Sequence, residues 1–232
     1  MFTHVDLNLP QLKRETIDGI RYYKIPGQEN LQRLVSITSV TSHYNKEKFA
    51  EWREKVGEAE ANRICRESTS IGTDTHTLTE QYLRNLDCNS DVIPMSEMLF
   101  QIMVPALNNI NNIHALEGSL YSSSLGIAGT TDCIGEYTGD NGIPELAIID
   151  FKTSKYPKPR KWIEDYFVQC CAYACMLHEL TGLSVKKFVI IMGCRDGELR
   201  VYEEYDKKKY FNLLLKYIKK FVNDKVMDYE RV

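Results

Sequence analysis

Two apolar, β-prone runs on either side of a short polar turn constrain the fold of this chain more than any other feature. The turn occupies residues 138–142, and its Asn-Gly step between such runs predicts a β-hairpin. If the hairpin is symmetric about Asn141, Asp132 and Asp150 face each other across it. Lys152 shares their face, because side chains alternate along a strand. The hairpin therefore predicts two carboxylates and an ammonium group on one face of a sheet.

The second strand of this hairpin reads as a buried strand, because Leu-Ala-Ile-Ile occupies residues 146–149 directly before Asp150. Two carboxylates held face to face at a buried position repel each other, and a cation would remove that cost. Carboxylate oxygens are preferred ligands of Mg²⁺ and Mn²⁺, so the pattern indicates a divalent-metal site with Lys152 beside it. Two simpler interpretations stay open: a structural ion pair, or an aspartate that only ends a strand.

Four motifs follow one another along the chain: Gly72-Thr73-x-x-His76, Gly129-x-x-Asp132, Asp150-Phe151-Lys152-Thr153-Ser154 and Gln169-x-x-x-Tyr173. This series resembles the RecB-like branch of the PD-(D/E)XK nuclease superfamily. Further upstream, Ser39-Val40-Thr41 is followed by Trp52-Arg53. These residues resemble the entry segment of the mitochondrial genome maintenance exonuclease family and its relatives in tailed phages. The likeness covers roughly residues 36–201, and it departs from the superfamily pattern at Thr131, where a proline is usual.

The resemblance and the order of the expected elements favour an α+β fold of the α/β-sandwich type, with a mixed central β-sheet flanked by helices. The resemblance implies a restriction-endonuclease-like core with a helical N-terminal part. We expect a single nuclease domain over residues 1–232. Its parts would be a mainly helical segment with the histidine motif at about 37–116, the catalytic sheet core at about 117–205 and a C-terminal helix at about 206–232.

Hydrophobic periodicity and breaker residues give the expected elements. Helical segments are expected at 46–68, at 73–86 after a break at Gly72, at 96–116, at 160–180 and at the C-terminal end. Strands are expected at 21–25, 119–123, 128–137, 145–152, 187–192 and 199–205. On the helix at 160–180, Gln169 and Tyr173 are one turn apart, beside the apolar stripe that should pack on the sheet.

The resemblance also implies roles for individual residues. Asp132, Asp150, His76 and the backbone carbonyl of Phe151 would bind Mg²⁺ or Mn²⁺, with Glu117 a weaker candidate for the outer shell of the metal. Lys152 would join Asp132 and Asp150 as a catalytic residue, and we expect it to orient the nucleophile and stabilise developing negative charge. Substrate contacts are expected from Gln169, Tyr173, Thr153, Ser154, Lys155, Ser39, Thr41 and Trp52.

The composition suits a chain that buries one sizeable core, with 43% hydrophobic and 26% charged residues among 232. Because no apolar run approaches a membrane span and the first residues do not resemble a signal peptide, we expect a cytoplasmic protein without a membrane partner. The cytoplasm would be that of a host if the gene is viral, as the phage resemblance suggests. The seven cysteines follow no Cys-x-x-Cys spacing. We therefore expect reduced thiols and no iron–sulfur cluster, with Cys170 and Cys171 in the core.

The charge distribution leaves the substrate open, because a net charge of −3 is not typical of a nucleic-acid binder. Basic residues do gather beside the predicted metal site, at Lys152, Lys155, Lys158, Arg160 and Lys161. They form either a solvated loop or a guide for a phosphate backbone. Aromatic residues that are either core or stacking surfaces for unpaired bases are Tyr44, Trp52 and Tyr82.

Three functions follow from these observations. The resemblance implies single-stranded DNA that is digested from an end, with a helical arch that admits a threaded strand. We therefore favour a metal-dependent DNA exonuclease acting on single strands or flaps in replication, repair or recombination. The alternatives are a structure-selective endonuclease or nickase of the same fold, and a noncatalytic nucleic-acid-binding module. Opposed buried carboxylates argue against the last, since a pure binder has no need of them.

Overall fold

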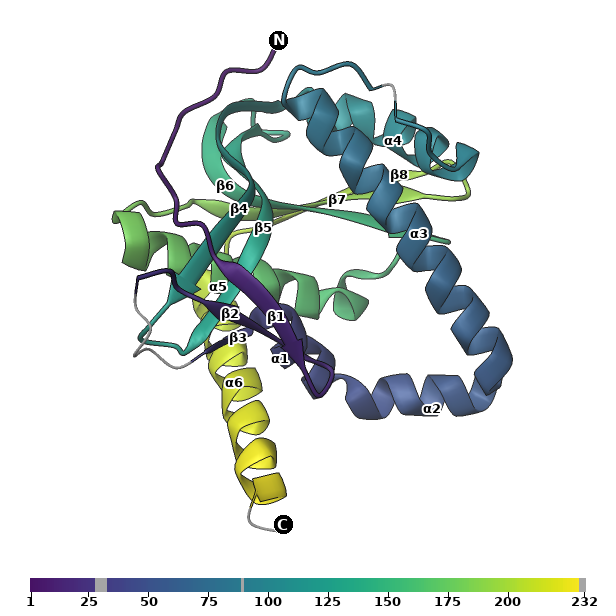
Figure 1. Ribbon diagram of the computed structural model, residues 1–232. Coiled ribbons are helices and arrows are strands. Elements are labelled where there is room, and N and C mark those ends of the chain that lie inside the picture. Colours follow the sequence, from purple (N-terminus) through teal and green to yellow (C-terminus); the bar gives the residue numbers. More distant parts are fainter. Residues whose placement is uncertain (28–32, 89, 230–232) are drawn as a thin grey trace.

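A mixed β-sheet with helices on both faces forms the centre of the computed structural model, which describes residues 1–27, 33–88 and 90–229 (Figure 1). The strands are β1 (Lys13–Ile17), β2 (Ile20–Lys24), β3 (Leu34–Ser36), β4 (Ile110–Ser122), β5 (Ile127–Thr138), β6 (Pro144–Ser154), β7 (Lys187–Cys194) and β8 (Leu199–Glu204). The helices are α1 (Ile37–Tyr44), α2 (Lys46–Val56), α3 (Glu58–Leu83), α4 (Pro94–Leu107), the 3-10 turn η1 (Arg160–Trp162), α5 (Glu164–Thr181) and α6 (Lys207–Tyr229). This arrangement confirms the predicted α+β fold.

The sheet opens beside its central strand. The strand order is β1-β2-β3-β5-β6-β7-β8. Strand β4 lies off this path and pairs with the edge of β5 that faces away from β3 and β6. On the edge away from β4, β5 pairs with β3 at Ile127 and Ala128 and with β6 from Cys133 onward. Among the described residues, positions 129–132 have no strand partner on that edge. In the part of the chain that the structure describes, four residues of β5 between β3 and β6 therefore have no neighbouring strand on this edge.

Strands β5 and β6 form the predicted hairpin. Their register runs from Thr138 opposite Pro144 to Cys133 opposite Ile149, and it is symmetric about Asn141 as predicted. Successive residues of β6 point to opposite faces, so Ile148 joins one hydrophobic core and Ile149 joins the other. Because both faces of β6 are covered, the strand is apolar without alternation, which the sequence shows as a continuous run.

Two hydrophobic cores hold the helices to the sheet. On one face, α5 buries Phe167 and both Cys170 and Cys171 against strand residues such as Ile190, with α1 and α6 packed around it. On the other face, α3 and α4 contribute a second cluster that includes Met103. No helix in the described part of the chain is both long and apolar enough to cross a membrane.

Several predicted boundaries are wrong. Gly72 does not end a helix, because one glycine costs only about 1 kcal/mol and buried residues on both sides of it hold α3 in place, among them Ile71 and Thr75. The helix expected at 96–116 ends at Leu107, and the apolar residues that follow belong to β4, which pairs with β5. The sheet core therefore begins before residue 117, and β1 to β3 also belong to it. The helix expected from residue 160 begins at Glu164, after η1.

Candidate active site

Asp132 lies where the hairpin opens. The ladder between β5 and β6 ends at Cys133 and Ile149, one position before Asp132 and Asp150 would pair. Asp132 Oδ2 instead accepts a hydrogen bond of 2.8 Å from the backbone N–H of Phe151. Strand β6 stays paired with β7 through this point, with Asp150 opposite Ile190. The predicted register therefore brings the two aspartates together. The next backbone hydrogen bond of the ladder, however, is replaced by the bond from Phe151 N–H to the Asp132 side chain.

Asp150 is a buried carboxylate with an incomplete set of partners. It is only 1% exposed, and Oδ2 forms an ion pair with Lys152 Nζ. Within the described residues, Oδ1 has no hydrogen-bond partner. Burial raises the pKa of Asp150 above its ordinary value, with Lys152 opposing the shift and Asp132 adding to it. A buried carboxylate oxygen without a donor is costly, and a cation bound at that oxygen would offset the cost.

Lys152 is a fixed cation beside this carboxylate. Burial alone would lower the pKa of Lys152, but Asp150 and Asp132 outweigh burial and hold that pKa above its ordinary value. The ammonium group also donates a 3.3 Å hydrogen bond to the Phe151 carbonyl and lies 5.3 Å from the centre of the Tyr166 ring. These contacts keep a positive charge in one place at the open edge of β5.

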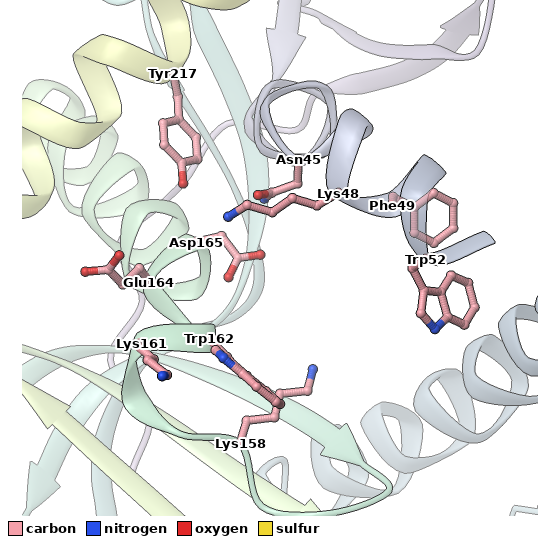
Figure 2. Close-up of a pocket in the computed structure, with 10 residues that line it drawn as sticks. All are labelled: Asn45, Lys48, Phe49, Trp52, Lys158, Lys161, Trp162, Glu164, Asp165 and Tyr217. Atoms are coloured by element: carbon pink, nitrogen blue, oxygen red, sulfur yellow. The ribbon is translucent and has the colours of Figure 1, made fainter. Parts of the chain in front are cut away.

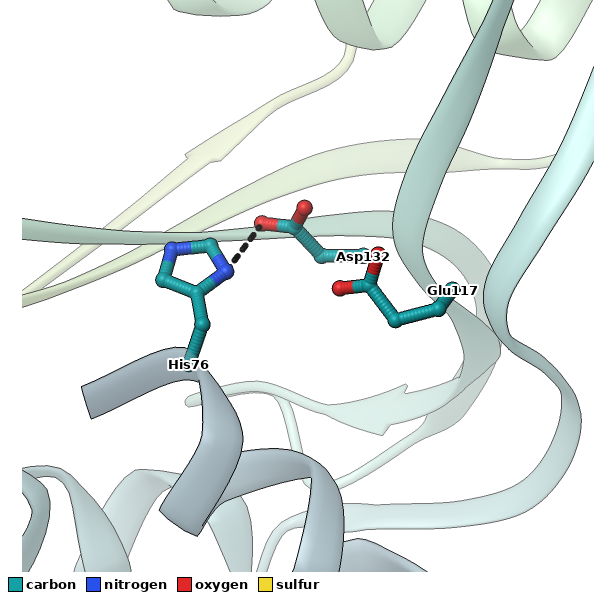
Figure 3. Close-up of side chains that lie close together, drawn as sticks. All are labelled: His76, Glu117 and Asp132. Atoms are coloured by element: carbon teal, nitrogen blue, oxygen red, sulfur yellow. Dashed lines mark ion pairs between the residues drawn. The ribbon is translucent and has the colours of Figure 1, made fainter. Parts of the chain in front are cut away.

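His76 reaches the site from α3, and one hydrogen bond sets its tautomer. Its Nε2 lies 2.9 Å from the Phe151 carbonyl oxygen. A carbonyl only accepts, so Nε2 carries the proton and the neutral ring has its lone pair on Nδ1. That Nδ1 lies 3.7 Å from Asp132 Oδ2 (Figure 3). An imidazole fixed through one nitrogen and open at the other is the usual arrangement of a metal-binding histidine.

Glu117 completes a cluster with His76 and Asp132. The prediction that Glu117 precedes the strand is wrong, because the residue lies inside β4. Its neighbours Leu116 and Gly118 pair with Cys133 and Thr131 of β5. Its φ of 51° is in the left-handed region, which costs a non-glycine residue energy and is common at functional sites. Partial burial, then Asp132 and Glu80, raise the pKa of Glu117 to about 7.

This donor set fits a hard divalent cation. One ligand atom from each of His76, Glu117 and Asp132 lies within 4.8 Å of the other two (Figure 3). Two carboxylates and a neutral imidazole suit Mn²⁺ well and Mg²⁺ acceptably. The Asp150 carboxylate lies next to this cluster rather than in it, and its unpaired Oδ1 is a further oxygen donor. The Phe151 carbonyl already accepts from His76 and Lys152 here, and its role as a ligand stays a prediction.

A cleft of about 550 Å³ contains the cluster and part of the predicted substrate site. Gln169 and Tyr173 line it, and Gln169 Nε2 donates a 3.0 Å hydrogen bond to the Tyr173 hydroxyl, as their helical spacing suggested. Tyr173 is 1% exposed, and a Cβ at Gly129 would lie 2.7 Å from its Cε1 atom. Glycine is therefore required at 129 so that this ring can lie against β5.

The remaining predicted substrate residues are placed differently. Thr153 continues β6 beside α3, since its Oγ1 would lie 3.8 Å from a Cβ at Gly72. Ser39 lines a neighbouring hollow and accepts a hydrogen bond from Arg21, while Thr41 is buried and donates to Thr38. None of these three predicted residues lines the cleft, and neither do the other three predicted substrate residues, Ser154, Lys155 and Trp52. Their roles, like those of the other predicted site residues, stay predictions.

Several cleft residues were not identified from the sequence. Arg14 and Arg21 line the cleft from β1 and β2, together with Ser36 and Thr38. The available signal was the Asp18-Gly19 step between two short β-prone runs, a typical hairpin turn. Both turn residues have positive φ, and β1 pairs with β2 across them. That hairpin places two guanidinium groups on the cleft.

A sheet that opens beside its central strand has two aspartates and a lysine at the opening, with a histidine from a long helix facing them. This arrangement agrees with the resemblance to PD-(D/E)XK nucleases inferred from the sequence. The RecB-like branch stays a prediction.

Sequence comparison finds relatives of this chain that are named exonucleases. The chain is 32% identical to mitochondrial genome maintenance exonuclease 1 of Homo sapiens over 96 residues, and 32% identical to the Xenopus tropicalis protein of that name over 134 residues. The matched segments are 39% and 55% of this chain, but only 26% and 37% of those relatives. A crystal structure of a candidate exonuclease from Eubacterium rectale matches with a TM-score of 0.44 and 13% identity, over 67% of this chain and 66% of that one. No protein-family model matches the chain.

Proposed function

We propose that this protein is a metal-dependent DNA exonuclease that hydrolyses phosphodiester bonds in single strands or flaps, acting in the cytoplasm. The observation that supports this most is the juxtaposition of the His76, Glu117 and Asp132 ligand atoms with the buried pair of Asp150 and Lys152. A structural ion pair alone accounts for Asp150 Oδ2, but not for the partnerless Oδ1 or for three further ligand atoms within 4.8 Å of one another. The names of the sequence relatives agree with an exonuclease.

Each residue of the site has a separate task in this proposal. Asp132, His76 and Glu117 hold the cation, and Asp150 adds its unpaired oxygen. When bound, Mg²⁺ or Mn²⁺ supplies Lewis-acid polarisation of the scissile phosphate and promotes ionisation of the attacking water. Lys152, fixed by its ion pair with Asp150, orients that water and stabilises negative charge that develops on the phosphoryl oxygens. Gln169 and Tyr173 contact the nucleotide next to the cleaved bond.

The preference for single strands rests on the helices that precede the site. Helices α1, α2 and α3 leave the sheet, turn through Asn45 and Gly57, and return to it, which forms an arch on one side of the molecule (Figure 1). The return limb α3 carries His76 to the metal cluster. An arch closed at the sheet suits a flexible strand with a free end better than a rigid duplex. This geometry favours the exonuclease over the endonuclease or nickase.

The test uses single-stranded DNA labelled separately at each end, with Mg²⁺ or Mn²⁺ and with chelator. Asp150→Ala removes the central carboxylate, and Asp91→Ala is its matched control, since Asp91 is exposed and does not line the cleft. The proposal is supported if the wild type and Asp91→Ala remove the label only when metal is present, while Asp150→Ala does not remove it. Circular single-stranded DNA distinguishes the second candidate, because an exonuclease leaves circles intact. No cleavage by a folded protein that still binds the strand would favour the noncatalytic module.

A further inference from the structure

A second hollow, of about 730 Å³, lies between α2 and the connection from β6 to α5 (Figure 2). It lies outside the metal cluster, and no residue named above as a metal ligand lines it. Its walls carry aromatic rings and lysines: Phe49, Trp52 and Lys48 on the α2 side, and Trp162, Lys158 and Lys161 on the other. Asn45, Tyr217, Glu164 and Asp165 complete the lining.

The aromatic residues of α2 are not core residues. Across the part of the chain that the structure describes, α2 has no buried residue. Phe49 is 48% exposed and stacks on Trp52, with ring centres 5.4 Å apart. By contrast, the other two residues considered as stacking surfaces are packed in the protein: Tyr44 stacks on Tyr217, and Tyr82 contacts Phe2 and Phe100. Of the three predicted stacking candidates, Trp52 is the one that lines this hollow.

Trp162 faces the hollow from the opposite side and is 67% exposed. Its position is fixed by the turn that carries it. Arg160 donates hydrogen bonds of 2.7 and 2.8 Å to the carbonyl of Glu203 and the carboxylate of Glu204, which fastens η1 to β8. The backbone N–H of Trp162 donates to the Pro159 carbonyl at 2.8 Å. These bonds hold the exposed indole in place beside the hollow.

Charge and position connect the hollow to the metal cluster. Lys158 and the catalytic Lys152 each lie within 5.3 Å of the centre of the same Tyr166 ring. Of the acidic groups in the lining, Glu164 pairs with Lys209 at 2.9 Å, and Asp165 lies within the electrostatic reach of Lys158 and Lys152. The lining therefore holds three lysines against two carboxylates, and Glu164 is paired with Lys209 from outside it, so positive charge is in excess and favours a phosphate backbone.

We infer that this hollow is a nucleobase-stacking subsite for an unpaired DNA strand, with Trp162 as its principal ring and Phe49 and Trp52 on the facing wall. The inference rests on the proposed function and adds where the strand lies beyond the cleaved bond. Exposed rings stack on bases whose faces are free, and duplex DNA offers such faces only at its ends. The hollow would thus contribute to the preference for single strands, with the lysines holding the backbone between stacked bases.

The experiment measures binding without cleavage, by fluorescence anisotropy of a labelled oligo(dT) in chelator. Trp162→Ala should weaken binding by about 5-fold to 150-fold, the equivalent of one base–aromatic stack, while Trp162→Phe should restore most of the affinity. An oligonucleotide with abasic sites should bind the wild type and Trp162→Ala equally. Phe211→Ala is the matched control, because Phe211 is an exposed aromatic residue on α6 outside the hollow, and it should bind as the wild type.

Equal affinity of Trp162→Ala and the wild type for oligo(dT) would overturn the inference. So would an equal loss on oligo(dT) and on the abasic strand, since stacking needs a base. A second readout uses Trp52→Phe, which leaves Trp162 as the single tryptophan of the chain. Oligo(dT) should quench its fluorescence, and no quenching at saturating oligonucleotide would contradict the inference. Because all these measurements are made without metal, an absence of cleavage in the activity assay would remove the proposed nuclease function and leave this subsite standing.

Discussion

The carboxylate of Asp132 accepts the backbone N–H of Phe151 at 2.8 Å, so a side chain of β5 occupies the position of a ladder partner for β6. The bond fixes Asp132 at the point where the two strands separate. The same oxygen, Oδ2, lies 3.7 Å from His76 Nδ1, and a carboxylate oxygen of Asp132 lies within 4.8 Å of ligand atoms of both His76 and Glu117. Asp132 therefore lies at the end of the hairpin ladder and is also one of the three residues of the metal cluster.

Asp132→Asn should separate these two tasks. The amide oxygen can still accept from Phe151, so we expect the variant to fold with a melting temperature near that of the wild type in chelator. It loses a ligand charge, so the rise in melting temperature on adding Mn²⁺ should disappear. Loss of an outer-shell partner of a metal ligand costs about 10- to 100-fold in activity, and loss of the ligand itself should cost more. A normal Mn²⁺ shift in Asp132→Asn would contradict the assignment of Asp132 as a ligand.

Lys152→Ala should keep metal binding and lose turnover. The lysine stabilises charge that develops during cleavage, and removing one such group costs about 100- to 1000-fold in turnover. Single-turnover cleavage of end-labelled DNA at saturating Mn²⁺ measures the effect, with Lys208→Ala as control, because Lys208 is an exposed lysine on α6 that lines neither the cleft nor the hollow beside α2. Near-normal turnover in Lys152→Ala would remove its catalytic role.

His76→Ala should weaken metal binding, because it removes the Nδ1 lone pair that faces Asp132 and the hydrogen bond to the Phe151 carbonyl. Titration calorimetry with Mn²⁺ should show at least about a 10-fold loss of affinity. His178→Ala is the matched control, since His178 lies exposed on α5 and does not line the cleft. Equal affinity in the two variants would mean that the imidazole does not bind the metal.

Glu117→Gln should change how the stability of the metal-free protein depends on pH. The pKa of Glu117 is about 7 in the folded protein against 4.5 as its ordinary value. The folded state therefore binds more protons between these values, and its stability falls as pH rises through that interval. The variant lacks this charge, so its melting temperature in chelator, relative to the wild type, should increase from about pH 5 to about pH 8. A difference that stays constant with pH would contradict the shifted titration.

Two glycines should respond oppositely to alanine. Gly129→Ala places a Cβ 2.7 Å from Tyr173, and such overpacking costs about 1–3 kcal/mol of unfolding free energy. Gly72→Ala meets only an ordinary contact of 3.8 Å with Thr153 inside α3, and better helix propensity should add about 0.5–1 kcal/mol. Urea unfolding of the two variants measures both effects. Destabilisation by Gly72→Ala would show that α3 needs glycine for close approach to β6.

The sequence alone determined the hairpin and the side chains that it brings together. The Asn-Gly turn and the two apolar runs set a register symmetric about Asn141, and the alternation of side chains then placed Asp132, Asp150 and Lys152 near one another. Helical spacing likewise put Gln169 beside Tyr173. These relationships are local, so turn chemistry and periodicity suffice to predict them.

Only the tertiary structure decided the rest, because it depends on contacts between segments far apart in the chain. Glu117 reaches Asp132 because β4 pairs with β5, in a stretch whose apolar residues read equally well as helix. Gly72 stays helical because packing on the sheet outweighs its intrinsic preference. The side chain of Trp162 meets the wall of α2 across a hollow formed by residues more than a hundred positions apart. Local patterns carry no information about such distances, which the assembled sheet and its helices fix.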